Sequence, residues 1–182
     1  MRYASIRSMD ISNGVGLGIA LFVQGCHFHC VNCFNQETWD FNGGKEWTEG
    51  IESDFINLLV ANQHIDRVSI LGGEPLCNEN IVAICNLIKT IKLHFPEKKI
   101  WCYTGYTWEQ IFNTRQLDDL HYRLYDDFRK DAVAMVDVLV DGQYIDKLRD
   151  LTLIFRGSSN QRIIDVQKSL ESNSIVLWEN DI

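Results

Sequence analysis

The chain has 182 residues, 46% of them hydrophobic and 23% charged, so it can bury one substantial core but is short for two. We therefore expect a single domain over residues 1–182. The net charge of −8 and the pI near 5.0 disfavour nucleic acids and anionic membranes as partners, because both are bound through clustered Lys and Arg. The N-terminal residues lack the apolar core of a signal peptide, and no segment has the ~20 apolar residues that cross a bilayer, so we expect a cytoplasmic protein.

The first segment, Tyr3 to Gly18, contains polar residues and three glycines, and we expect it to be irregular. Its run GVGLG does not have the spacing of a phosphate-binding loop and precedes a strand-like segment instead of a helix. Ile19–Val23 is continuously apolar, which is typical of a strand covered on both faces. This strand leads directly into the run QGCHFHCVNCF, Gln24 to Phe34.

That run sets three cysteines within eight residues: Cys26, Cys30 and Cys33. One short loop can turn three thiolates toward a common centre, and both iron–sulfur clusters and zinc occupy such loops. A cubane normally takes four cysteine ligands, so three would leave one iron open to bind a substrate. Zinc is the alternative, with a tetrahedron completed by His27, His29 or Cys77, although structural zinc usually has two ligand pairs.

The middle of the chain alternates helices with strands. Thr48 can cap a helix whose buried stripe contains Ile51, Phe55, Leu58 and Leu59. Arg67–Leu71 is the next strand, and it runs into Gly72-Gly73-Glu74-Pro75. Glycines there would let the backbone approach a ligand, but a plain strand-to-helix turn also uses glycine and proline. Asn78 can cap the following helix, which ends before Pro96 and places Cys85 in the core.

The last third continues the alternation. We expect a strand at Ile100–Tyr103, a capping box at Thr107 and Gln110, and a helix at Leu117 to Lys130. Val136–Val140 is a further strand, and Leu151–Phe155 is a possible fifth one that ends in the polar run Arg156 to Arg162.

Alternating strands and helices predict an α/β fold with a mainly parallel sheet and right-handed crossovers. Because ligands of such sheets bind beyond the carboxyl ends of the strands, we expect the motifs to share that edge. The chain is well short of the ~250 residues of a complete eight-fold barrel. An open, partial (β/α) barrel is therefore the expected architecture.

The spacing C-x3-C-x2-C after a first strand is the cluster motif of the radical S-adenosylmethionine (SAM) enzymes. Within them, the chain resembles the activating proteins of anaerobic ribonucleoside-triphosphate reductases over nearly its whole length. The runs that carry this resemblance are Asn13–Gly16, Leu21–Cys26, Glu37–Trp39, Gly72–Pro75, Tyr103–Tyr106, Asp137–Gln143 and Arg156–Arg162. Two positions depart from the patterns: Asn32 precedes the third cysteine where many radical SAM enzymes have an aromatic residue, and Val15 stands where proline is expected.

The resemblance implies a radical SAM barrel and a [4Fe-4S] cluster held by Cys26, Cys30 and Cys33, with SAM bound to the open iron. It implies that Asn32, Cys33 and Phe34 lie near the adenine end of SAM, and that Gly72, Gly73 and Glu74 lie at its methionine end. No side chain needs to act as an acid or base. The 5′-deoxyadenosyl radical would abstract hydrogen from a glycine of the large reductase subunit, with an electron from a donor such as reduced flavodoxin.

The polar run near the C-terminus could meet that glycine. A buried glycine backbone needs hydrogen-bond partners, which Arg156, Asn160 and Arg162 could supply. Alternatively, Arg156 and Arg162 pair with acidic residues such as Asp141 and brace the sheet. Other functions also remain open: pyruvate formate-lyase activating enzyme, 7-carboxy-7-deazaguanine synthase, or a non-catalytic zinc or iron–sulfur protein.

Overall fold

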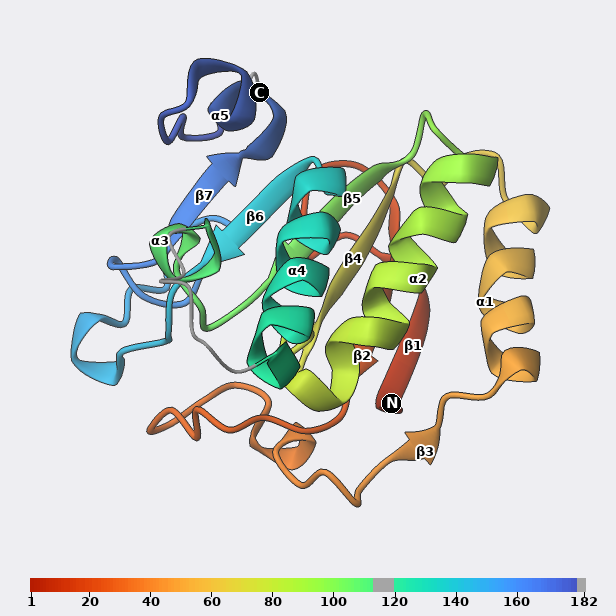
Figure 1. The fold of residues 1–182 in the computed structure, drawn as a ribbon, viewed down its shortest axis with the longest axis horizontal. Helices are drawn as coiled ribbons and strands as arrows, with labels where there is room; N and C mark the ends of the chain where they lie inside the picture. The colour runs from red at the N-terminus through yellow and green to blue at the C-terminus, as the bar shows by residue number, and fades with distance from the viewer. Residues whose placement is uncertain (113–119, 180–182) are drawn as a thin grey trace.

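The computed structural model describes residues 1–112 and 120–179, apart from the side chains of residues 120–123. Figure 1 shows one sheet with helices packed along it. The strands are β1 (Arg2–Asp10), β2 (Gly18–Val23), β3 (Lys45–Glu46), β4 (Arg67–Gly72), β5 (Lys99–Tyr103), β6 (Val138–Asp141) and β7 (Arg162–Asp165). The α-helices are α1 (Glu49–Ala61), α2 (Asn78–His94), α3 (Trp108–Phe112), α4 (Leu120–Met135) and α5 (Val166–Ser172), and short 3₁₀ helices cover Gln36–Thr38 and Asp146–Leu148.

The strands form one sheet in the order β3-β1-β2-β4-β5-β6-β7. The pairs β2–β4, β4–β5 and β5–β6 are parallel, whereas β1 and β3 at one edge and β7 at the other pair antiparallel. This confirms the α/β class and the mainly parallel centre of the sheet. The sheet is open and does not close on itself.

Two of the expected segments were wrong, and the first is the N-terminus. Residues 2–10 form strand β1, which pairs with β2 from Tyr3 opposite Val23 to Asp10 opposite Gly18. Only the connection at 11–17 is irregular. The strand escaped notice because just two of its residues, Tyr3 and Asp10, are buried, so its sequence shows little alternation.

The second error is the strand expected at Leu151–Phe155, which forms turns instead. The Asp150 carboxylate accepts hydrogen bonds from the N–H and hydroxyl of Thr152, and this local bonding competes with a strand ladder. Leu151 is 75% exposed. The final strand is β7, and because it runs antiparallel to β6, its first residue, Arg162, lies opposite Asp141 at the carboxyl edge of the sheet.

Local signals placed most helices correctly. The Thr48 hydroxyl accepts a hydrogen bond from the Ile51 N–H at the start of α1, and Thr107 and Gln110 form the expected capping box. Helix α2 begins at Asn78 itself, with Cys77 as its cap residue. Of the helix expected at Leu117 to Lys130, residues 117–119 lie outside the described residues, and α4 continues to Met135. Within residues 1–112 and 120–179, no helix has the length and apolarity needed to span a membrane.

The two faces of the sheet differ in what covers them. Helices α1, α2 and α4 pack on one face (Figure 1), where Ile19, Leu21, Val68, Ile70 and Leu139 form the main core with residues of these helices. On the other face, residues 11–17 cover the fully buried Arg67. Its guanidinium pairs with Asp10 (Nη2 to Oδ2, 2.8 Å) and bonds the Ser69 hydroxyl at 2.6 Å.

Glycine at position 14 allows this covering loop to lie close to the sheet. Gly14 has φ +134°, and a Cβ there would lie 2.9 Å from both Arg67 and Trp101. The Ser69 hydroxyl also donates to the Asn13 carbonyl at 2.5 Å. The run Asn13–Gly16 therefore covers Arg67 on this face and leaves the carboxyl end of the strands open.

Candidate functional site

A cavity of about 440 Å³ lies at the open, carboxyl end of this second face. Its floor contains Phe22, Leu71 and Tyr103, from the neighbouring strands β2, β4 and β5. Its walls come from loops that follow the strands: the cysteine loop, the turn at 72–74, residues 104–105 and 142–144, and the segment 150–157. The cavity thus lies where the strand pattern predicts a ligand site.

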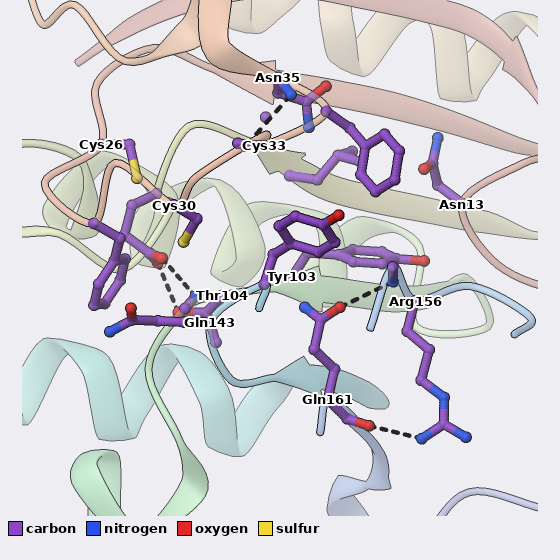
Figure 2. Close-up of a pocket in the computed structure, with 18 of the residues that line it drawn as sticks. Asn13, Cys26, Cys30, Cys33, Asn35, Tyr103, Thr104, Gln143, Arg156 and Gln161 are labelled. Atoms are coloured by element: carbon purple, nitrogen blue, oxygen red, sulfur yellow. Dashed lines mark hydrogen bonds between the residues drawn. The ribbon is translucent and has the colours of Figure 1, made fainter. Parts of the chain in front are cut away.

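Cys26, Cys30 and Cys33 all line this cavity, and all three are free thiols. The loop is held by backbone bonds: the Cys26 N–H donates to the Trp39 carbonyl (3.1 Å) and the Cys33 N–H donates to the Cys30 carbonyl (3.1 Å). His29 and Asn32 adopt left-handed φ values of 45° and 55°, which turn the chain twice between the cysteines. Figure 2 shows the three cysteines together on one side of the cavity.

Burial disfavours the thiolate form of two of these cysteines in the protein alone. It raises the pKa of Cys26 to about 11 and also raises the pKa of Cys30, where the neighbouring Cys33 adds to the effect. Within the described part of the chain, no three His, Cys, Asp or Glu side chains are placed to enclose a single metal ion. An iron–sulfur cluster fits this donor set, because its positive irons favour thiolates and each cysteine can bind a different iron.

The residues that could complete a zinc site are occupied elsewhere. The His27 Nε2 atom lies 3.0 Å from a Glu79 carboxylate oxygen, and its ring packs on Phe41. The His29 ring packs on Trp39. Cys77 is fully buried at the start of α2 and does not line the cavity. With His27 and Cys77 placed in this way, and with no three-ligand group among the described residues, the geometry does not favour the zinc alternative.

The turn at Gly72-Gly73 is shaped by close packing between two strand ends. The Gly73 N–H donates to the Val23 carbonyl (2.9 Å), and the Glu74 N–H donates to the Gly25 carbonyl (2.7 Å). A Cβ on Gly73 would lie 2.4 Å from that Gly25 oxygen, and Gly72 has φ +103°. Since both N–H groups are used inside the protein, the turn can offer a ligand its carbonyl oxygens, which suit a donor such as an amino group.

Glu74 is buried and joins two segments around the cavity, its own turn and the residues after β5. Its carboxylate accepts hydrogen bonds from the Leu76 N–H (2.9 Å), the Thr104 hydroxyl (2.7 Å) and the Gly105 N–H (2.7 Å). Burial nevertheless raises the pKa of Glu74 to about 7, against these hydrogen bonds, which lower it. Glu74 therefore holds the turn and the β5 end in place, and its oxygens are already bonded within the protein.

The two residues that flank Cys33 take different places. Phe34 lines the mouth of the cavity, where its ring meets Tyr144 edge-on (centroids 5.3 Å apart) beneath the Arg149 guanidinium. Asn32 does not line the cavity. Its side chain is hydrogen-bonded to the Asp146 carboxylate, which lowers the pKa of Asp146, so Asn32 connects the cysteine loop to the segment after β6.

The three candidate residues of the polar run Arg156 to Arg162 also take different places. Arg156 lines the cavity, and its Nη1 donates to the Gln161 carbonyl at 2.6 Å. Asn160 is exposed and donates to the Gln143 carbonyl. Arg162 pairs with Asp141 (Nε to Oδ1, 2.9 Å) and with Glu109 (Nη1 to Oε1, 2.9 Å), so for Arg162 the bracing alternative is the one the structure contains.

Residues 12–164 match the sequence model of the 4Fe-4S single cluster domain family. The chain is also 37% identical to the anaerobic ribonucleoside-triphosphate reductase-activating protein of Escherichia coli K12, over 88% of this chain and 96% of that protein. Its identity to the protein of that name from Enterobacteria phage T4 is 35%, over 100% of both chains, and to that of Vibrio cholerae 34%, over 90% of this chain and 97% of that protein. The chain belongs to the family of anaerobic ribonucleoside-triphosphate reductase-activating proteins.

In this member of the activating-protein family, the cavity is also lined by Trp39 and Tyr103, which were not among the site residues expected from the sequence. Among the described residues, three buried side-chain polar atoms lack a hydrogen-bond partner: Trp39 Nε1, the Tyr103 hydroxyl and Arg156 Nε. All three residues line this one cavity. Trp39 and Tyr103 both belong to runs that carry the family resemblance, Glu37–Trp39 and Tyr103–Tyr106, and Tyr103 also ends a predicted strand at the edge where ligands bind.

Proposed function

We propose that the protein cleaves SAM reductively at a [4Fe-4S] cluster and generates a glycyl radical on the large subunit of an anaerobic ribonucleoside-triphosphate reductase. The observation that carries the proposal is the placement of three free cysteines on one cavity, in a chain whose family model is a 4Fe-4S domain. The names of the relatives favour this reductase over pyruvate formate-lyase or a deazaguanine pathway as the context. The open sheet supports a partial barrel of the radical SAM type.

In this proposal Cys26, Cys30 and Cys33 hold the cluster. When bound there, the cluster would supply the single electron, drawn from a low-potential donor such as reduced flavodoxin, for the cleavage of SAM into methionine and a 5′-deoxyadenosyl radical. That radical takes a hydrogen atom from the glycine and leaves as 5′-deoxyadenosine. We assign the reaction to the cytoplasm, whose reducing conditions suit a chain with six free thiols.

The remaining residues position and shield the reactants. The carbonyl oxygens of Gly72 and Gly73 accept hydrogen bonds from the amino group of SAM, while Glu74 fixes their turn without needing to touch it. Phe34 covers the adenine end at the cavity mouth, and Asn32 holds its loop through Asp146. Arg156 and Asn160 are the proposed contacts to the reductase, and Arg162 supports them through its ion pairs.

Single cysteine variants test the ligand assignment. Cys26→Ala, Cys30→Ala and Cys33→Ala should each lose the cluster and all SAM cleavage, because the cavity has no other cysteine to replace a missing ligand. Cys85→Ala is the matched control, since Cys85 is buried in the helix-covered core. Iron content and 5′-deoxyadenosine yield would be measured after anaerobic reconstitution with SAM and dithionite. Full activity of Cys30→Ala, or loss of the cluster in a folded Cys85→Ala protein, would contradict the assignment.

A further inference from the structure

Tyr103 stands out among the residues on the cavity floor. It is the last residue of β5, and its ring packs between Phe22 and Leu71 on one side and Trp101 and Val140 on the other. Its hydroxyl oxygen is buried, and no described residue offers it a hydrogen bond. Figure 2 shows the side chain projecting into the middle of the cavity, between the cysteines and Arg156.

An unpaired buried hydroxyl is informative because it costs stability in the protein alone. Phenylalanine would fill the same space without that cost, so the hydroxyl gives the free protein nothing. Burial also raises the pKa of Tyr103, which keeps the hydroxyl protonated and able to donate at neutral pH. The hydroxyl is therefore suited to a group that enters the cavity from outside.

The other two unpaired atoms indicate what kind of group this is. Trp39 Nε1 and Arg156 Nε can only donate hydrogen bonds. Three residues that line the cavity thus each have an unmatched donor, and a ligand that reaches these atoms has to bring acceptor oxygens. Arg156 gives its Nη1 to the Gln161 carbonyl, which leaves its Nε for an oxygen of the ligand.

A peptide main chain brings such oxygens, one carbonyl for each residue. The floor around the hydroxyl is apolar, formed by Phe22 and Leu71. The mouth carries Phe34 and Leu151, which are largely exposed and offer an apolar rim to a polypeptide entering from another protein. The groups assigned to SAM belong to the cysteine loop and to the end of β4 with its turn, whereas Tyr103 ends the neighbouring strand β5.

We infer that Tyr103 is a positioning residue whose hydroxyl donates a hydrogen bond to a main-chain carbonyl of the glycine-bearing segment of the reductase. The inference rests on the proposed function and adds to it the group that holds the protein substrate. Its consequence is a trade between stability and binding: the hydroxyl destabilises the free protein and stabilises the complex with the substrate.

The variant Tyr103→Phe separates these two effects. Its melting temperature without ligands should rise by about 2–4 °C, because the unpaired hydroxyl is gone while the ring stays. A synthetic peptide that reproduces the glycine-bearing segment should bind the reconstituted, SAM-loaded variant roughly 3–10-fold more weakly, as expected for one lost hydrogen bond. The affinity for SAM and the rate of SAM cleavage without reductase should stay within about twofold.

Tyr3→Phe is the control, because Tyr3 is also buried but packs on Trp47 on the helix-covered side, and its hydroxyl is not among the unpaired buried atoms. It should leave peptide affinity unchanged and should not raise the melting temperature. Weaker SAM binding with unchanged peptide binding in Tyr103→Phe would assign the hydroxyl to the cofactor and overturn the inference, as would unchanged binding of both. A wild-type protein that binds the peptide but never cleaves SAM would refute the proposed function, while the peptide titration still decides the role of Tyr103.

Discussion

At the scale of single residues, the site depends on the buried carboxyl group of Glu74, to which we assign no acid or base role. Glu74 accepts three hydrogen bonds that connect the turn after β4 to the end of β5. Burial and hydrogen bonding act in opposite directions on its ionisation, and burial prevails, since the pKa is raised from 4.5 to about 7. The folded protein therefore holds a proton at pH 6 that the unfolded chain releases.

This difference predicts a dependence of stability on pH. Because the folded pKa of Glu74 is raised, its contribution is fully present below about pH 4.5 and is lost as the pH rises to about 7, a fall of roughly 3 kcal/mol. Urea unfolding of the cluster-free protein and of Glu74→Gln, compared from pH 4 to 8, isolates this group. Relative to that of Glu74→Gln, the free energy of unfolding of the wild type should fall by roughly this amount across that window. A constant difference would mean that the three donors outweigh burial and that Glu74 is ionised throughout.

The sequence predicts which residues form the site far better than it predicts which residues they contact in the folded protein. The spacing of Cys26, Cys30 and Cys33 was enough to predict the loop and its place on a ligand-binding cavity, because both follow from the chain near the first strand. The need for glycine at position 73 comes from the backbone of Gly25, 48 positions earlier, which no local pattern contains. In the same way, the unpaired state of Tyr103 depends on what packs around it and cannot be read from a strand motif.

At the scale of elements, the antiparallel edge formed by β6 and β7 supports the loop 142–161, which lines one side of the cavity. Arg162 at the start of β7 bonds Asp141 at the end of β6, and it reaches Glu109 at the start of α3. The Asp141 carboxylate also accepts the Trp108 N–H at 2.8 Å. Three elements are thus joined at the edge where the loop 142–161 departs and returns.

Replacing Arg162 tests whether it braces this edge. Asp141 is only 1% exposed, so Arg162→Met would leave a buried charge without its ion pair, at a cost of about 3–5 kcal/mol in unfolding free energy. Glu109 is 47% exposed, so Glu109→Gln should cost less than about 1 kcal/mol. Chemical denaturation measures both. A loss below about 1 kcal/mol in Arg162→Met, together with impaired radical transfer to the reductase, would instead favour direct docking by Arg162.

Elements were predictable where the pattern is local and strong. The buried central strands are continuous apolar runs, and helices α1 and α3 directly follow the capping residues Thr48 and Thr107. Strand β1 has few buried positions, so its pairing with β2 leaves a weak trace in the sequence. The run Leu151–Phe155 shows the opposite: its apolar residues line and border the cavity, which makes them look like a strand although they pair with none.

At the scale of the whole molecule, the main core and the cavity lie on opposite faces of the sheet. The main core lies between the sheet and the helices on one face (Figure 1), while the loop 11–17 covers Arg67 and Ser69 on the other face. The cavity at the carboxyl edge of that face brings the cysteine loop, the glycine turn and the floor tyrosine together. Alternating strands and helices were enough to predict that edge; the covering loop was not predictable, because it depends on contacts with Arg67.

Electron paramagnetic resonance on the partner reductase tests the central claim most directly. The protein would be reconstituted anaerobically with iron and sulfide, mixed with SAM, a reductant and the large reductase subunit, and frozen. The account predicts a stable glycyl radical signal on the reductase, about one 5′-deoxyadenosine formed per radical, and neither product with Cys30→Ala. A reconstituted wild-type protein that carries a [4Fe-4S] cluster yet yields no glycyl radical and no 5′-deoxyadenosine would contradict it.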